Sequence, residues 1–431
     1  MQIHWIKNTK NKVISQGGIY FIKMLFEQHG IDSFINRWQE QRPVQSRYRD
    51  SDILLSLGYC SYTGGDYLED INRIRQDFNK KDEFKMPSSD TITYRINQLI
   101  DKDIYLAGKK NVTHQFNYQP SLNQLLVNLS VHLNPQWKKT GQVLDYDNTI
   151  IETTKGDCKK TYKGNTGYQP GVMFINRCPV YVEGRNGNSN SIFDIENTLK
   201  RSLDMLTARK VRLSSIRIDG AGFKGETMSV LENYPDLLYY IRGRNAHRWW
   251  SNYNKTFKAT LNELDLEYQD TKPFIPGKNP DEKVTRAIVY RYKKEEASQK
   301  KLFEDHNYIY YIIYTNDYKS TPLEIITHYN NRGTAEQNYD RLKNDFNWKH
   351  PPYPTLAQNT VYFIFMAIAN ILYQWLLTLV SQYFKGIDLQ TRMKRFIFLF
   401  VNVPCKWTYR GRRNILNVYA NQAYYKLITD T

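Results

Sequence analysis

Apolar side chains recur every three or four residues along much of the first 125 residues, and polar turns separate the runs. This spacing places the apolar residues on one face of a helix, so each run predicts an amphipathic helix. The last run starts after Pro87, two serines and an aspartate, which is a typical helix start, and it carries Arg95. We expect a helical region over residues 1 to 125. The runs are Gly17–Ile31, Asp50–Tyr62, Asp66–Phe78 and Pro87–Ile100.

The pattern changes at Gly141, where apolar and polar side chains alternate in short runs. Alternation with a period of two predicts strands, and two intervening runs with helical spacing predict helices. The resulting order is three strands, a helix, a strand, a helix and a strand, as in a ribonuclease-H-like α/β core. We place the first part of this core at residues 140 to 243. The runs are Gln142–Thr154, Gly167–Arg177, Pro179–Arg185, Ser189–Arg209, Val211–Gly222, Gly225–Tyr234 and Leu237–Arg244.

Residues 244 to 320 depart from this order and predict a mainly β insertion. Aromatic and aliphatic residues alternate in Thr285–Lys294 and Tyr308–Asn316, and such strands need a surface to pack against. The segment Thr271–Lys283 is polar and predicts a loop. The core then resumes at residues 321 to 385. The predicted fold class is therefore α/β, with a ribonuclease-H-like core interrupted by a mainly β insertion and preceded by a helical N-terminal region.

One apolar stretch, Val361–Val380, approaches the length of a membrane span. Asn370 and Gln374 interrupt it, and the surrounding sequence is basic and polar, so we expect a buried helix and no membrane contact. The N-terminus has no apolar core of the signal-peptide type. A basic C-terminal region follows at residues 386 to 431. Its cations include Arg392, Lys394, Arg395, Lys406, Arg410, Arg412 and Arg413.

The charge balance favours a polyanionic partner. The chain has 60 basic and 43 acidic residues, a net charge of +17 and a pI near 9.4. Nucleic acid is the leading candidate, and a merely basic protein is the alternative. Helices in residues 1 to 125 can hold a helix-turn-helix for DNA, or form a packing domain without base contacts. Four cysteines without a CxxC pair indicate free thiols in a reducing cytoplasm.

The segment Tyr329–Lys343 carries the most specific pattern in the chain. Tyr329, Arg332, Glu336 and Lys343 follow one another at intervals of three, four and seven residues. A continuous helix places them on one face, where cations neutralise phosphate and the carboxylate holds a divalent cation. Gly333, with Thr334 and Gln337 as a capping box, predicts instead a restart with Glu336 in a first turn. A solvated helix with ordinary ion pairs is the remaining alternative.

Three further acidic residues lie on predicted strands. Asp145 and Asp147 share one face of the first strand, and Asp219 ends the strand expected beside it. Phosphoryl transfer with two metal ions needs carboxylates from several elements, and Asp147, Asp219 and Glu336 can supply them. The alternative for Asp219, which precedes a glycine, is a turn residue at the end of a strand without a catalytic role. The alternative for Asp145 and Asp147 is that they face solvent.

Taken together, DNTI at Asp147, RIDGAG at Asp219 and the Tyr329 to Lys343 spacing resemble the DDE transposases of bacterial insertion sequences. The similarity is to the cut-and-paste group with a β insertion in a ribonuclease-H-like catalytic core, and it covers roughly residues 40 to 385. It implies that Asp147, Asp219 and Glu336 are catalytic and bind two Mg²⁺ or Mn²⁺ ions. Asp145 is the rival for the first position, but Thr149 matches the family threonine that follows its aspartate by two residues.

The resemblance also implies the partners and the reaction. Tyr329, Arg332 and Lys343 would contact transposon-end DNA, and an aromatic residue would stack on a flipped base if hairpin ends form. Trp249 and Trp250 are candidates for that residue, although packing explains them as well. The expected activity is metal-dependent cleavage at terminal inverted repeats and strand transfer to target DNA, by a homodimer in the bacterial cytoplasm near the nucleoid. The alternatives are a structure-specific endonuclease and a non-catalytic DNA-binding descendant of a transposase.

Overall fold

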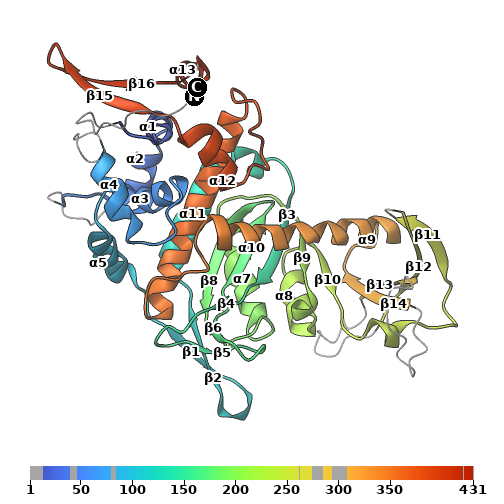
Figure 1. Cartoon of the computed structure of the whole chain (residues 1–431). Helices are drawn as coiled ribbons and strands as arrows, with labels where there is room; N and C mark the ends of the chain where they lie inside the picture. Colours follow the sequence, from blue (N-terminus) through green and yellow to red (C-terminus); the bar gives the residue numbers. More distant parts are fainter. Residues whose placement is uncertain are drawn as a thin grey trace, which may run out of the picture. The chain divides into compact units, whose positions relative to one another are not determined.

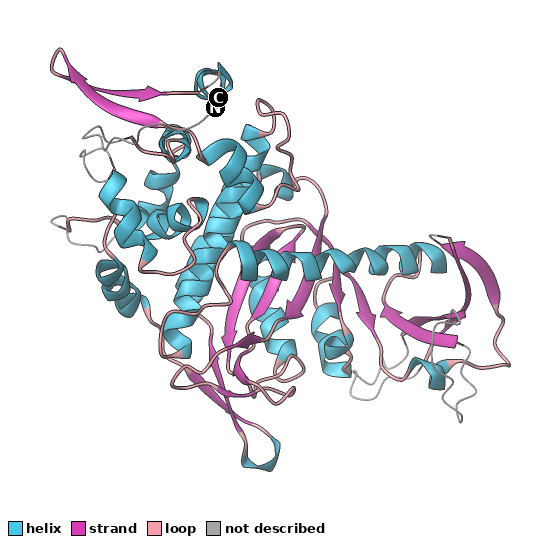
Figure 2. Cartoon of the chain, viewed as in Figure 1, coloured by secondary structure: helices cyan, strands magenta, loops and turns pink. Residues whose placement is uncertain are grey.

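The computed structural model describes residues 13–38, 46–78, 84–261, 263–273, 285–293, 308–420 and 422–430. The chain divides into two compact units, and we describe each by itself. Unit 1 comprises Met1–Ile100, Asp340–Tyr353 and Val361–Thr431, and unit 2 comprises Asp101–Tyr339 and Pro354–Thr360. Helices dominate the described part of unit 1, and a large mixed sheet with its covering helices forms unit 2 (Figures 1 and 2).

Unit 2 is built on an 11-stranded sheet with the order β1-β2-β8-β7-β3-β9-β10-β14-β13-β12-β11. Its only parallel pairs among the described strands are β3 with β9 and β9 with β10. A small second sheet has the order β4-β6-β5. The strands are β1 Ile104–Ala107, β2 Thr113–Asn117, β3 Gln142–Asn148, β4 Ile151–Glu152, β5 Lys159–Lys160, β6 Thr166–Tyr168, β7 Gly171–Ile175, β8 Cys178–Arg185, β9 Leu213–Ile218, β10 Leu238–Arg242, β11 Phe257–Leu261, β12 Leu264–Thr271, β13 Arg286–Lys293 and β14 Tyr308–Thr315.

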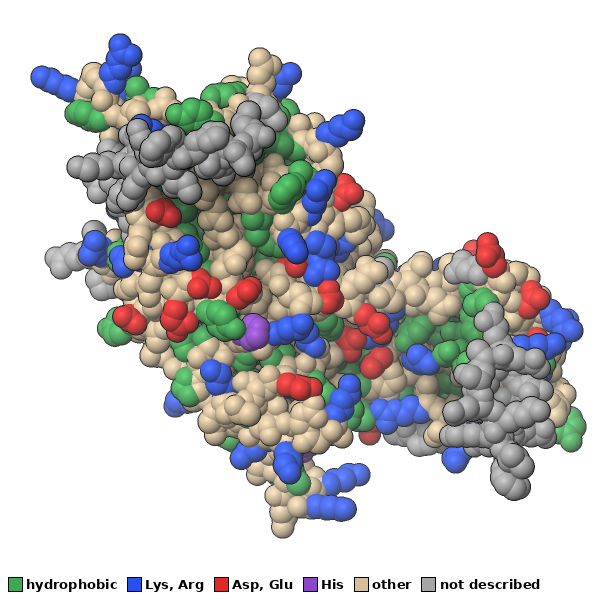
Figure 3. Space-filling view, viewed as in Figure 1, with side chains coloured by type: hydrophobic (Ala, Val, Ile, Leu, Met, Phe, Trp, Pro, Cys, Tyr) green, Lys and Arg blue, Asp and Glu red, His purple; other side chains and the backbone are tan. Residues whose placement is uncertain are grey.

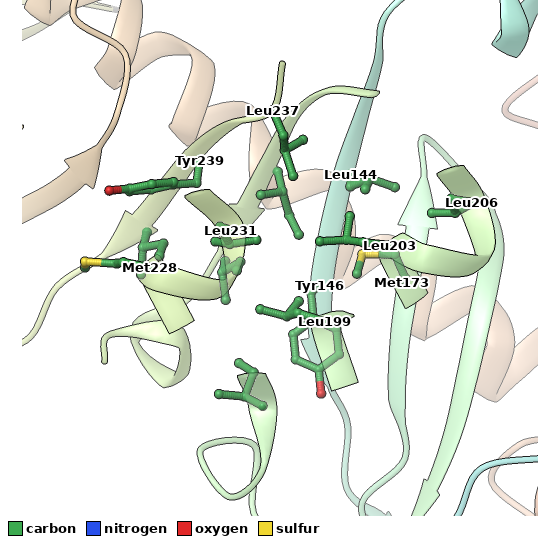
Figure 4. Packing of buried hydrophobic residues seen from close by; sticks show 14 of the residues in the cluster. Leu144, Tyr146, Met173, Leu199, Leu203, Leu206, Met228, Leu231, Leu237 and Tyr239 are labelled. Carbon is green, nitrogen blue, oxygen red and sulfur yellow. The ribbon is translucent and has the colours of Figure 1, made fainter. Parts of the chain in front are cut away.

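Alternating side chains give the large sheet two different faces. Leu144 and Tyr146 of β3 point into a core that also takes apolar residues from α6 (Pro120–Leu133), α7 (Ile195–Ala208) and α8 (Gly225–Glu232) (Figure 4). On the opposite face, α9 (Pro322–Asn330) packs on β10, β13 and β14. Since the side chains of a strand alternate, Asp145 and Asp147 face away from the core of α6, α7 and α8.

The elements expected between Gln142 and Arg244 occur in the predicted order, with β3, β7, β8, α7, β9, α8 and β10. The fold class of mixed α/β is confirmed. The two strands predicted for the insertion form β13 and β14, while β11 and β12 were not predicted. All four continue the same sheet because β14 pairs with β10. Most of the predicted polar loop Thr271–Lys283 lies outside the described residues.

Two strands lie where the sequence indicated mostly helix. β1 and β2 pair with each other, and β2 adds to the sheet beside β8. Their short runs lack clear alternation, and most residues of β1 are exposed, so no pattern marked them. Their pairing with β8 depends on residues nearly 70 positions away, as in Phe116 with Arg185.

Unit 1 contains most of the remaining helices and one hairpin. The amphipathic runs of the sequence form α1, α3, α4 and α5, and the apolar stretch forms most of α11. The hairpin consists of β15 Cys405–Arg410 and β16 Arg413–Val418. The helices are α1 Gly18–Gln28, α2 Ile31–Asn36, α3 Asp50–Tyr62, α4 Asp70–Phe78, α5 Ser89–Leu99, α11 Leu356–Val380, α12 Met393–Phe396 and α13 Gln422–Thr429; α10 Thr334–Asp345 and α11 each have residues in both units.

Helix α11 is long and apolar enough to cross a membrane by length and composition alone. It is mostly buried, with 78% of its most apolar window inside the structure. Within unit 1 its backbone and side chains are bonded to neighbours: Tyr62 donates to the carbonyl of Ala369 at 2.7 Å, and Tyr373 donates to that of Thr391 at 2.7 Å. These contacts are typical of a core helix.

Arg95, expected on a helix that could contact DNA, is a buried structural residue. Its guanidinium donates to both carboxylate oxygens of Asp50, at 2.8 and 3.1 Å. Both residues are buried, with 8% and 7% exposure. The charge of Arg95 is therefore satisfied inside unit 1.

Candidate active site at the ends of two parallel strands

The register of the central strands brings Asp147 and Asp219 together. In the parallel pair of β3 and β9, Tyr146 lies opposite Ile218, so the next residues on each strand, Asp147 and Asp219, are neighbours. Asp219 accepts a hydrogen bond from the amide of Ala221 at 2.9 Å, which fixes the turn after β9. Two carboxylates therefore lie side by side at one edge of the sheet.

Asp145 lies on the same face as Asp147 but is committed to another partner. Arg217, opposite it on β9, donates to both of its carboxylate oxygens at 2.7 Å. Asp145 is only 2% exposed, and Arg217 also donates to the carbonyl of His328 at 2.8 Å. This pairing makes Asp145 a structural residue and leaves Asp147 as the available carboxylate of β3.

The segment from α9 to α10 breaks between its two helices. Helix α9 begins with a capping box, in which Thr321 accepts from the amide of Glu324 and the Glu324 carboxylate accepts from that of Thr321. A 3₁₀ turn at Asn331–Gly333 then precedes α10. The continuous helix is therefore wrong, and the restart with Glu336 in the first turn of α10 is confirmed. The side chain of Thr334 lies outside the described part, so the second capping box stays a prediction.

The turn between the helices brings Arg332 onto the aspartates. Its guanidinium forms an ion pair with Asp147 at 3.0 Å and donates to the carbonyl of Tyr146 at 3.1 Å. Tyr329, at the end of α9, donates to the carbonyl of Ile218 at 3.4 Å, one residue before Asp219. Arg332 thus lies at the end of β3, and Tyr329 lies at the end of β9.

The electrostatics of this cluster follow from burial of like charges beside the Arg332 guanidinium. Burial raises the pKa of the Asp147 carboxyl to about 6; Arg332 opposes this effect, and Asp219 adds to it. Burial alone would lower the pKa of Arg332, but Asp147, Tyr329 and Asp219 together hold it above its usual value. Burial also raises the pKa of Tyr329 to about 12, so its phenol is protonated at neutral pH.

Tyr339 is a residue of this site that the sequence did not identify. It lies on α10, is 5% exposed, and donates a hydrogen bond to the carbonyl of Asp147. Its ring packs edge-on against Phe174 of β7, with centroids 5.2 Å apart. Its position three residues after Glu336 on α10 was a possible signal, but one tyrosine among 34 does not stand out.

The other two signature residues lie on α10. The Glu336 side chain is exposed in its first turn, and Lys343 is half-buried in the part of the helix that belongs to unit 1. Within the described ranges, no three His, Cys, Asp or Glu side chains are close enough to hold a metal ion. The structure thus brings together Asp147, Asp219, Arg332 and Tyr329, and it does not bring Glu336 to the two aspartates.

The sequence itself decides the family. Residues 6–428 match the family model described as Transposase DDE domain group 1. The chain belongs to this transposase family. No curated protein matches the chain significantly. A solved structure of piggyBac transposase, in a synaptic complex with hairpin DNA, aligns with 91% of this chain and 82% of its own at 12% identity and a TM-score of 0.41.

DDE transposases generally use divalent metal ions, and the paired aspartates of this group 1 transposase suit such an ion. Carboxylate oxygens are the ligands that Mg²⁺ and Mn²⁺ prefer. The raised pKa of Asp147 reflects burial next to a second carboxylate, and a nearby cation relieves that cost. Two of the three expected ligands, Asp147 and Asp219, therefore fit a metal centre. The third, Glu336, lies on the first turn of α10.

Two other expectations concern aromatic and basic residues. Trp249 packs edge-on against Tyr314 at 6.4 Å, and Trp250 lies against the Arg291 guanidinium at 4.1 Å. Both are partly buried against the core, as expected for packing residues. In the basic C-terminal region, Arg392 forms ion pairs with Asp340 and Asp345 at 2.7 and 2.6 Å. Its charge is therefore used within unit 1.

Proposed function

We propose that this group 1 DDE transposase catalyses DNA transposition of a bacterial insertion sequence. In this proposal it binds the terminal inverted repeats, cleaves at the element ends and joins the freed 3′-hydroxyl to target DNA. The observation that carries the proposal is the pair Asp147 and Asp219 at the ends of two parallel strands, in a chain whose family is established. We take the order β8-β7-β3-β9-β10 with its helices to be a ribonuclease-H-like core.

The proposed ligands of the two Mg²⁺ or Mn²⁺ ions are Asp147, Asp219 and Glu336. Bound metal ions would activate the attacking oxygen and stabilise the leaving oxygen of the phosphodiester. Asp147 and Asp219 supply a rigid base for this site, because β3 and β9 lie in the centre of the sheet. Glu336 would complete the set from the first turn of α10, which follows the 3₁₀ turn at Asn331–Gly333.

Arg332 and Tyr329 have roles that follow from their contacts. The Arg332 guanidinium offsets the negative charge of Asp147 and is proposed to bind the phosphate backbone of a cleaved end. The Tyr329 phenol is neutral and can donate to a phosphate oxygen if it releases the carbonyl of Ile218. Lys343 is proposed as a further backbone contact along α10.

Cleavage at both ends of an element requires the two ends to meet, so we propose a homodimer in the complex with DNA. Hairpin ends are part of the proposal because the resemblance to the cut-and-paste group implies them. The proposed location is the bacterial cytoplasm at the nucleoid.

The test is a cleavage assay with a labelled duplex that carries the element's own end, run with Mg²⁺ and with EDTA. We expect metal-dependent nicking at the repeat boundary. Glu336→Gln should abolish nicking and leave end binding within about twofold, since one lost carboxylate changes few phosphate contacts. Cleavage by Glu336→Gln at the wild-type rate would exclude the proposed ligand set.

The same gel separates the alternatives. Products joined to target DNA indicate a transposase, and nicked products without joining indicate a structure-specific endonuclease. Specific binding without any cleavage, with both ends supplied, indicates a non-catalytic DNA-binding protein.

A further inference from the structure

The β15–β16 hairpin of unit 1 has one apolar and one basic face. Cross-strand partners share a face, so Trp407 with Leu416 forms part of one face, and Arg410 with Arg413 forms part of the other. Lys406, Thr408 and Asn417 lie on the same face as the two arginines. Thr408 accepts a hydrogen bond from Asn417 at 2.8 Å. The hairpin thus presents cations and hydrogen-bonding groups on one side.

The base of the hairpin is anchored in unit 1, and its tip is exposed. Cys405 exchanges two backbone hydrogen bonds with Ile14, at 2.9 and 2.8 Å, and is buried. The Trp407 indole donates to the Tyr20 hydroxyl at 2.9 Å and packs edge-on against that ring. Beyond Thr408 every residue up to Ile415 is exposed. A ribbon with a fixed base and an exposed tip is suited to contact a large partner.

The turn at the tip gives the hairpin a defined twist. Its two central residues, Gly411 and Arg412, both have positive φ, at 58° and 63°. Two-residue turns of this kind match the right-handed twist of the flanking strands. Arg412 adopts a conformation that glycine or asparagine would adopt more readily, so its side chain is retained there at a conformational cost.

The charges of the hairpin are all positive. Cys405–Val418 contains one lysine and three arginines and no acidic residue. Arg410, Arg412 and Arg413 are exposed and form no ion pair with any residue in the described part of the chain. Arg410 lies directly opposite Arg413, and like charges in that position destabilise a hairpin unless an anion lies between them. Lys and Arg side chains mark the hairpin tip in Figure 3.

We propose that the β15–β16 hairpin binds duplex DNA, with Arg410, Arg412 and Arg413 on backbone phosphates. This inference rests on the proposed function. It identifies the β15–β16 hairpin as the part of the basic C-terminal region that contacts DNA. The major groove, about 12 Å wide, admits a two-stranded ribbon. Arginines at the tip then reach phosphates at the groove edges, and such contacts position a protein without reading the sequence.

The experiment measures DNA affinity against salt concentration for the full chain and for Arg410→Ala/Arg412→Ala/Arg413→Ala. Each lost phosphate contact lowers the slope of log K against log salt by about 0.9, so three contacts lower it by about 2.7. The alanine variant should lose the same factor in DNA affinity on the element end and on an unrelated duplex. The matched control replaces the same three arginines by lysine, which keeps the charge and should retain most of the slope. Circular dichroism and the melting temperature check that each variant is folded.

The outcomes separate this inference from the proposed function. An unchanged slope and affinity in the folded alanine variant, with a wild-type chain that binds and cleaves its end, overturns the hairpin assignment alone. A wild-type chain that binds no DNA overturns the proposed function and this inference with it. A loss confined to the element end also contradicts the inference, because it indicates base contacts in place of phosphate contacts.

Discussion

Replacing Asp145 by asparagine tests the distinction between the two aspartates of β3. The change keeps the shape of the side chain and removes the charge that neutralises Arg217, with which Asp145 forms two hydrogen bonds of 2.7 Å. Both residues are buried, at 2% and 7% exposure. Removing one partner of a buried ion pair costs about 3–5 kcal/mol, because the other charge is left without compensation.

Asp147→Asn is the matched control, two residues further on the same strand. The folded-state pKa of Asp147 is about 6, above the ordinary value of 3.8, so its ionised form is disfavoured by folding. The loss of folding stability is absent below pH 4. It grows as the pH rises from about 4 to about 6 and is complete above pH 6. The net rise in the pKa of Asp147 already includes the opposing effect of the Arg332 ion pair and corresponds to about 3 kcal/mol, so Asp147→Asn should stabilise the chain by up to that amount at pH 8 and have little effect at pH 4.

The assay is urea denaturation followed by circular dichroism at pH 8 and pH 4, with EDTA present so that no metal contributes. Asp145→Asn should lower the unfolding midpoint at pH 8, and Asp147→Asn should leave it unchanged or raise it. If Asp147→Asn destabilises the chain as much as Asp145→Asn does, the division into a structural and a functional aspartate is refuted.

Two further predictions concern Tyr339 and Asp32. Tyr339→Phe removes the hydrogen bond to the Asp147 carbonyl; it should cost about 1 kcal/mol of stability and raise the Mn²⁺ concentration needed for half-maximal cleavage, with DNA affinity unchanged. An unchanged Mn²⁺ requirement would mean that Tyr339 only packs. Burial raises the pKa of Asp32 to about 6, and its Oδ1 has no hydrogen-bond partner in the described structure. Asp32→Asn should therefore stabilise the chain by about 1–2 kcal/mol at pH 8 and not at pH 4, as melting curves at the two pH values would show.

The central strands were predictable because local pattern determines them. Leu144 and Tyr146 alternate with Asp145 and Asp147, and the same alternation in β9 leads directly to Asp219. The extension of the sheet through β14 was not predictable, since β10 and β14 lie about 70 residues apart and several partners fit an apolar strand. For the same reason the sequence did not identify Asp50 as the partner of Arg95, since 45 residues separate the two.

The candidate site was predictable in its residue types and less so in its contacts. Spacing and the family resemblance selected Asp147, Asp219 and Arg332, which the structure brings together. The ion pair of Arg332 with Asp147 depends on the 3₁₀ turn at Asn331–Gly333, which a periodic pattern does not specify. Tyr339 was missed because its function is a hydrogen bond to a backbone carbonyl, and a side-chain motif does not record such a partner.

The central claim is that Asp147, Asp219 and Glu336 form one metal site. Its most direct test is the anomalous diffraction of Mn²⁺ in crystals of the full chain bound to its end duplex. We expect manganese bonded to oxygens of all three carboxylates, at about 2.0–2.2 Å. Manganese bound elsewhere, or bound with the Glu336 carboxylate outside its coordination sphere, would contradict the account.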